Sequence, residues 1–156
     1  MTYRTLPLVT DFVQGGFMKL FFAGSIRGGG GYLKVYRRII ALLNTHGEVI
    51  SEFMNDNGSS ETEGKKHDTA IHTRTTEAIR HSDLVVAEVS HPSIGVGYEI
   101  ALAESIGIPV IALYHRGSEY HLSAMIAGNE KIVVLPYDTF EELGTLLVKQ
   151  LAPHSS

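Results

Sequence analysis

The sequence contains no cysteine. Disulfide bonds, thiolate catalysis and cysteine-ligated zinc sites are therefore excluded. It also contains no apolar run of about 18 residues, the length that a membrane-spanning helix requires. Lys and Arg form no block, and the formal net charge is −4. A surface for a nucleic acid polymer is therefore not expected, although one or two local cations are enough to hold a small anion.

Several enzyme motifs are absent as well. The eight histidines show no H-E-x-x-H spacing, so no metal site is expected. Ser25, Ser93 and Ser123 lie outside any G-x-S-x-G elbow, which argues against a serine hydrolase. No dinucleotide fingerprint G-x-G-x-x-G occurs, so an oxidoreductase is a weak alternative and no cofactor is expected. The opening residues lack a signal-peptide pattern, and a cytoplasmic protein is expected.

The length and composition that remain predict one globular domain. The chain has 156 residues, of which 44% are apolar and 19% charged, an ordinary balance for a single core. Residues 1–17 show no periodicity and are expected to form an extension. The domain is expected over 18–152, followed by a tail at 153–156.

Short apolar segments alternate with amphipathic ones along the whole domain. Strands are predicted at 18–24, 48–54, 83–89, 108–114 and 131–137, and helices at 33–47, 68–81, 98–105, 121–128 and 139–151. The strands are apolar throughout, which is typical of strands covered on both faces. We therefore expect a three-layer α/β domain with a parallel, flavodoxin-like sheet of order 2-1-3-4-5.

In that order, the loops after the first and third strands diverge and leave a crevice at the sheet edge. The first loop, "SIRGGGG", offers backbone N–H groups, Ser25 and the Arg27 guanidinium to an anion. The second, "SHPSIGVG", leads to Glu99. From the residues alone, the first loop is as consistent with a flexible turn, and Gly95 and Gly97 could simply permit a tight turn. Local reasoning favours Glu99 as a stabilising charge at a helix N-terminus over a catalytic group.

Three ordered stretches resemble a known family. "FFAGSIRGG", "DLVVAEVSHPSIGVGYEIALAESIGIPVIALY" and "LSAMIAG" are similar to the 2′-deoxynucleoside 5′-phosphate N-hydrolases, within the nucleoside 2-deoxyribosyltransferase superfamily. The resemblance runs from Lys19 to Leu151. It implies a flavodoxin-like homodimer without metal or cofactor. The implied reaction cleaves the N-glycosidic bond of a nucleoside 5′-monophosphate, which gives a free base and a sugar 5-phosphate.

The resemblance also implies roles for individual residues. Glu99 matches the family's nucleophile, which attacks the anomeric carbon. Ser123 matches a serine that reaches the site from the partner subunit. The remaining implied phosphate contacts are Ser25, Arg27, Gly28 and Ser93, and the implied sugar or base contacts are Phe21, Gly24, Ile26, Gly95 and Met125.

Two positions depart from the family pattern. The family has an aspartate eight residues before Asp83, where this sequence has Thr75. Threonine does not ionise near neutral pH, and His72 on the same predicted helix is the favoured substitute for proton transfer. Phe21 stands where many members have tyrosine, which leaves the choice between ribose and 2′-deoxyribose open and admits CMP as a substrate.

Two other functions stay open at this point. A nucleoside 2-deoxyribosyltransferase would move the sugar between bases, but the phosphate-binding pattern speaks against it. A nucleotide-binding module without catalytic activity is supported by Thr75 at the position of the missing acid.

Overall fold

The computed structural model describes residues 18–25, 30–51 and 64–151. Its strands are β1 (Met18–Ala23), β2 (Gly47–Ser51), β3 (Leu84–Glu88), β4 (Val110–His115) and β5 (Ile132–Tyr137). Its helices are α1 (Gly30–Leu43), α2 (Gly64–Arg80), α3 (Ile94–Ser105), α4 (Ala124–Ala127) and α5 (Phe140–Leu151). Among the helices in these residues, none is long and apolar enough to cross a membrane.

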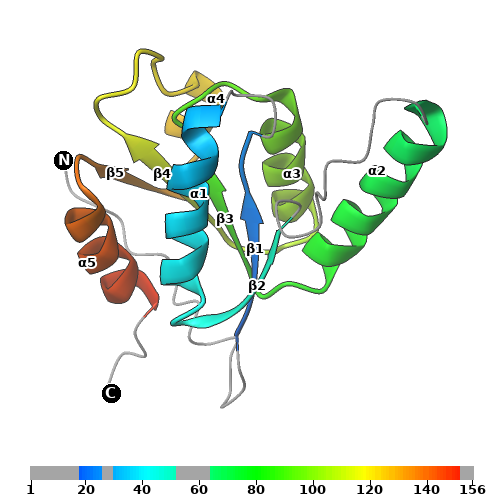
Figure 1. Cartoon of the computed structure of the whole chain (residues 1–156), viewed down its shortest axis with the longest axis horizontal. Helices are drawn as coiled ribbons and strands as arrows, with labels where there is room; N and C mark the ends of the chain where they lie inside the picture. Colours follow the sequence, from blue (N-terminus) through cyan, green and yellow to red (C-terminus); the bar gives the residue numbers. More distant parts are fainter. Residues whose placement is uncertain (1–17, 26–29, 52–63, 152–156) are drawn as a thin grey trace.

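The strands form one parallel sheet in the order β2-β1-β3-β4-β5. Helices α1 and α5 cover one face, and α2 and α3 cover the other (Figure 1). The predicted three-layer flavodoxin-like architecture and strand order are confirmed. Because all strands run the same way, the loops after β1, β3 and β4 meet at one edge of the sheet.

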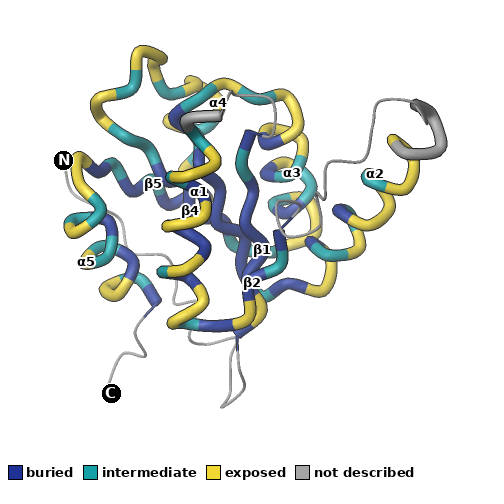
Figure 2. The backbone as a smooth tube through the Cα atoms, viewed as in Figure 1, coloured by how far each residue is buried: buried dark blue, intermediate teal, exposed yellow. Residues whose placement is uncertain are grey.

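Successive side chains of each strand enter two different cores. Leu20 and Phe22 of β1 pack beneath α1 and α5, whereas Phe21 and Ala23 pack beneath α2 and α3. Every residue of β3 is buried, and the strands are dark blue through the centre of the molecule (Figure 2). This two-sided burial explains why the strands read as continuous apolar runs rather than alternating ones.

Helices α1, α2 and α3 all begin three or four residues earlier than the sequence predicts, and the change in α3 affects the site. Helix α3 starts at Ile94 instead of residue 98, and Ser93 is its N-cap. Gly95 and Gly97 therefore lie within the first turn, and among the described residues only Gly107 has a positive φ, of 79°. The interpretation of Gly95 and Gly97 as a tight turn is wrong, because both adopt helical backbone angles.

Candidate active site

The first loop of the crevice is held from below by a tyrosine. Ser25 follows the end of β1 by two positions and is 7% exposed. Its backbone N–H donates to the hydroxyl of Tyr36, at 3.2 Å. Tyr36 comes from α1 and is itself buried. The predicted contact Gly24 is half-buried beside Ser25, and the stretch that continues the loop, with Ile26, Arg27 and Gly28, lies outside the described residues.

The second loop ends in a helix cap. The Ser93 hydroxyl oxygen accepts the Val96 N–H at 3.4 Å, and the Ser93 carbonyl accepts the Gly97 N–H at 3.1 Å. Ser25 and Ser93 follow the adjacent strands β1 and β3, so both lie at the same edge of the sheet. The partial positive charge at the N-terminus of α3 makes this edge suitable for an anion.

Glu99 is the sixth residue of α3, and no acidic residue lies in the first turn of that helix. The helix-dipole interaction falls off beyond the first turn. The expectation that Glu99 serves as a charge at the helix start is therefore wrong. Glu99 is half-buried and stands beside the residues of α3 that face the sheet, Val96, Ile100 and Ala103.

Helix α3 presents different residues to two neighbours. At 100° per residue, Glu99 and Tyr98 lie on one flank and Ala101 and Glu104 on the other. The first flank faces α2, because the Tyr98 hydroxyl lies 3.2 Å from His72 Nε2 and the centroids of the two rings are 5.9 Å apart, with the ring planes tilted by 58°. The second flank lines a cavity of about 610 Å³ between α3 and α4. In Figure 1, α3 lies between α2 and α4 accordingly.

The cavity beside α4 gathers three predicted site residues but not Glu99. Ser93, Ser123 and Met125 all line it. Ser123 caps α4, and its hydroxyl oxygen accepts the Met125 N–H at 3.3 Å. Met125 is 81% exposed and Ile94, also in the lining, is 95% exposed. Within one chain, Ser123 therefore lies on the opposite flank of α3 from Glu99.

Three other predicted residues lie near the first flank or under it. Thr75 is buried on α2 at 7% exposure, and His72 is exposed almost one turn before it. Phe21 is 1% exposed and packs in the core beneath α2 and α3. Within the described part of the chain, no group of three histidine or carboxylate side chains is arranged to hold a metal ion.

Sequence reasoning missed the support beneath the loops. The sequence pattern gave neither Tyr36 nor Ser90 a role at the site. Burial raises the pKa of the Glu88 carboxyl, and hydrogen bonds from Ser90 oppose this shift. Burial and the nearby Glu88 raise the pKa of Tyr36. The only sequence signal was a glutamate inside the apolar strand "VVAEV".

Comparisons with known proteins identify the family of the chain. Residues 20–146 match the family model described as "Nucleoside 2-deoxyribosyltransferase". The chain belongs to this family. It is 52% identical over 135 residues to the Syntrophotalea carbinolica protein named "Putative 2'-deoxynucleoside 5'-phosphate N-hydrolase 1", covering 86% of this chain and 95% of that protein. It is 40% identical over 112 residues to the Danio rerio 5-hydroxymethyl-dUMP N-hydrolase, covering 71% and 78%.

Solved structures of this family's fold are also similar. The Clostridium botulinum CMP N-glycosidase superposes with a TM-score of 0.61 at 19% identity, covering 83% of this chain and 97% of that one. The 2-deoxyribosyltransferase from Bacillus psychrosaccharolyticus superposes with a TM-score of 0.66 at 15% identity, covering 88% and 99%. At these identities the likeness supports the fold alone.

Proposed function

We propose that the chain hydrolyses the N-glycosidic bond of (2′-deoxy)ribonucleoside 5′-monophosphates, with Glu99 as nucleophile. The names of relatives at 52% and 40% identity support this class of reaction. The observation that carries the role of Glu99 is its half-buried position on the flank of α3 that faces α2, outside the first turn. The cytoplasmic location expected from the sequence is part of the proposal.

The proposed chemistry has two steps. A carboxylate oxygen of Glu99 attacks the anomeric carbon, the bond from that carbon to the base nitrogen breaks, and the base leaves with the electron pair and takes up a proton. Water then attacks the same carbon and displaces Glu99. This releases the sugar 5-phosphate and regenerates the carboxylate, as in retaining glycosidases.

The phosphate provides binding energy remote from the broken bond. Ser25, Arg27, Gly28 and Ser93 are the proposed phosphate contacts from the chain's own two loops. Holding the phosphate at the sheet edge orients the anomeric carbon toward Glu99, which lies further along α3. Phe21, Gly24, Ile26, Gly95 and Met125 are the proposed sugar and base contacts.

His72 is the proposed proton-transfer group in place of the family aspartate. Thr75, at the aspartate's position, is buried and does not ionise near neutral pH. His72 is on the same helix, and its hydrogen bond to Tyr98 supports a position beside α3. Tyr98 is the residue directly before Glu99. Histidine is the side chain most often used to donate or accept a proton in catalysis.

We also propose that the protein works as a homodimer. Ser123 and Glu99 lie on opposite flanks of α3 in one chain, so a serine from a second chain is needed for a shared site. The exposed Ile94 and Met125 beside the cavity support this face as the contact between copies. Apolar side chains exposed to this degree are typical of interaction surfaces.

Base release from a panel of ribo- and deoxyribonucleoside 5′-monophosphates tests the proposal. The Glu99→Gln variant is expected to lose at least about 100-fold in kcat, because removal of a nucleophile abolishes the covalent route. Glu141→Gln is the matched control, since Glu141 is an exposed glutamate on α5. Full activity in Glu99→Gln, or no base release from any nucleotide by the wild type, would overturn it.

The same assay separates the alternative functions. A nucleoside 2-deoxyribosyltransferase would form a new nucleoside when a second base is added. The likeness to the Bacillus psychrosaccharolyticus enzyme makes this control necessary. A nucleotide-binding module would bind a nucleotide without releasing the base.

A further inference from the structure

Ser90 is the residue at which two loops of the sheet edge are joined. It follows β3 by two positions and is 3% exposed. Its hydroxyl oxygen accepts the backbone N–H of His115, the last residue of β4, at 2.7 Å. Its carbonyl oxygen accepts the hydroxyl of Ser118 at 2.6 Å. One buried residue of the β3–α3 loop thus fixes two points at the start of the β4–α4 loop.

Glu88 orients Ser90. Its Oε1 atom accepts both the Ser90 hydroxyl and the Ser90 N–H. The hydroxyl proton is therefore directed to Glu88, which leaves the hydroxyl oxygen free to accept from His115. Within the described residues, Glu88 Oε2 has no hydrogen-bond partner. Burying a carboxyl group is unfavourable, and the hydrogen bonds it makes there are all to Ser90.

Each joined loop leads directly to a proposed phosphate contact. Ser93 follows Ser90 by three residues, and Ser123 follows Ser118 by five. The second loop stays bonded along its length, because the Tyr120 N–H donates to the Ser118 hydroxyl at 3.1 Å and its carbonyl accepts the Tyr114 hydroxyl at 2.8 Å. A displacement at Ser90 would therefore move both phosphate contacts.

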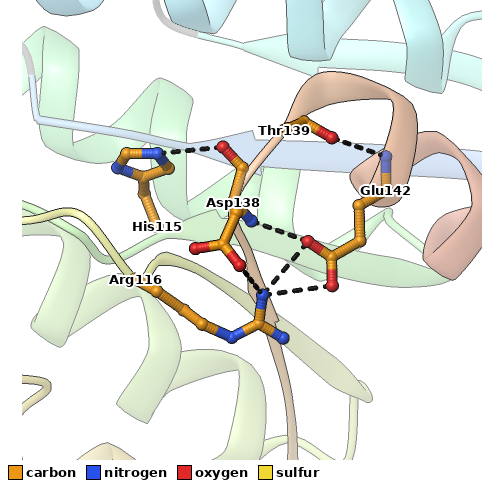
Figure 3. Close-up of polar contacts among 5 residues, drawn as sticks. All are labelled: His115, Arg116, Asp138, Thr139 and Glu142. Carbon is orange, nitrogen blue, oxygen red and sulfur yellow. Dashed lines mark hydrogen bonds and ion pairs between the residues drawn. The ribbon is translucent and has the colours of Figure 1, made fainter.

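The other anchor of the β4–α4 loop lies on the surface and does not involve Ser90. Arg116 Nη1 lies 2.7 Å from Asp138 Oδ2 and 3.1 Å from both carboxylate oxygens of Glu142 (Figure 3). Exposed ion pairs of this kind contribute little and are screened by salt. The rings of His91 and Tyr120 also bring the two loops into contact, with centroids 5.0 Å apart, but the buried hydrogen bonds between the loops are those of Ser90.

We propose that Ser90, oriented by Glu88, is a positioning residue that sets Ser93 and Ser123 together. This inference rests on the proposed function, in which both serines contact the substrate phosphate. Because Ser123 serves the neighbouring subunit in that proposal, one buried hydroxyl positions phosphate contacts for two sites. The site of its own chain receives Ser93, and the site of the partner receives Ser123.

The Ser90→Ala variant tests this, with Ser82→Ala as the matched control. Ser82 is also a buried serine, 7% exposed, and its hydroxyl donates to the Ala78 carbonyl at 2.7 Å. It lies just before β3, at the end of the strand away from the site. Amide hydrogen exchange is expected to accelerate in both loops, around Ser93 and around Ser123, in Ser90→Ala only. Acceleration in one loop alone, or in neither, would overturn the coupling whether or not the protein is a hydrolase.

Inorganic phosphate provides the functional readout. Phosphate is expected to compete with the nucleotide. Its inhibition constant should be about tenfold higher for Ser90→Ala than for the wild type, because misplaced contacts lose binding energy. The KM for the nucleotide should rise more than kcat falls, and Ser82→Ala should match the wild type in both. An unchanged inhibition constant in Ser90→Ala overturns the inference, whereas a wild type that releases no base overturns the proposed function instead.

Discussion

At the scale of single residues, the chemistry of the site depends on how protons are handled around Glu99. The family aspartate is replaced by Thr75, which is buried, whereas His72 is exposed and reaches Tyr98 on the neighbouring helix. The proposed nucleophile and the proposed proton-transfer group thus come from α3 and α2, and the hydrogen bond between His72 and Tyr98 holds the imidazole beside α3.

Replacing His72 by Ala should lower kcat by about 100-fold, the usual contribution of a general acid or base. His81→Ala is the control, because His81 is exposed, directly follows the last residue of the same helix and contacts only the nearby Glu77 in the interactions described for it. Steady-state kinetics of base release provides the measurement. A wild-type kcat in His72→Ala would contradict the proposed role of His72 in proton transfer.

Glu88 should make stability depend on pH. Its pKa is raised above the ordinary value of 4.5, first by burial, so the folded state binds its proton more tightly than the unfolded state. This contribution is fully present below pH 4.5 and is lost as pH rises through the folded pKa. In Glu88→Gln it is absent. The difference in Tm, variant minus wild type, should therefore increase from pH 4.5 upward, and a constant difference in thermal scans would contradict this.

The position of a single residue could be predicted from the sequence where it depends on neighbouring residues in the chain, and not where it depends on segments that are distant in the sequence. The positions of Ser25 and Ser93 at the edge of the sheet follow from strand ends that periodicity locates. The burial of Glu88 could not be predicted, because it depends on α1, β4 and β5 closing over the end of β3. Predicting that Glu99 and Ser123 lie on opposite flanks of α3 also required the correct first residue of that helix. Gly95 and Gly97 made that residue hard to predict.

At the scale of elements, most of the fold was predictable from periodicity, since β3 and its neighbours are buried on both faces. The predicted strand ends differ from the observed ones by no more than two residues where the structure describes both. The helix starts were predicted less well, because α1, α2 and α3 begin three or four residues earlier than expected, and α3 is the one that leads into the site. Glycine has a low helix propensity, so Gly95 and Gly97 favoured a loop, whereas the Ser93 cap and the packing of Val96 and Ile100 override that preference.

Gly95 offers a test of whether the first turn of α3 is built for a ligand. A Cβ there would meet only Ser93 Oγ, at 3.8 Å, so Gly95→Ala should stabilise the helix by up to about 1 kcal/mol and raise Tm. If sugar or base approaches this backbone, kcat/KM should fall together with that gain. Gly144→Ala in α5, whose Cβ would meet Leu42 at 3.9 Å, should raise Tm and leave the kinetics unchanged. Unaltered kinetics in Gly95→Ala would remove Gly95 from the proposed contacts.

At the scale of the whole molecule, mixing two inactive variants tests whether the sites are shared between chains. Glu99→Gln removes the nucleophile, and Ser123→Glu places a negative charge against the phosphate. If Ser123 acts on the neighbouring subunit, each mixed dimer contains one intact site and one doubly defective site. Random pairing makes half the dimers mixed, so about a quarter of wild-type activity should return.

The contrary outcome is equally clear. If Ser123 serves its own chain, every site in a mixed dimer carries one defect, and no activity returns after subunit exchange. Mass measurement in solution supplies the second check. Ile94→Glu should convert the protein to monomers and remove activity, because it places a charge on the exposed apolar face beside the cavity. An active monomer would contradict the shared site.

A site shared between the two flanks of α3 from different chains would also make the affinity for the nucleotide depend on the concentration of the protein. If a nucleotide bridges the Glu99 flank of one chain and Ser123 of another, it binds the dimer more tightly than the separated chains. Thermodynamic reciprocity then requires the nucleotide to strengthen subunit association by the same factor. Dilution should therefore weaken nucleotide binding, and saturating nucleotide should hold the pair together at concentrations where the free protein separates. The protein would respond to its own abundance as well as to its substrate.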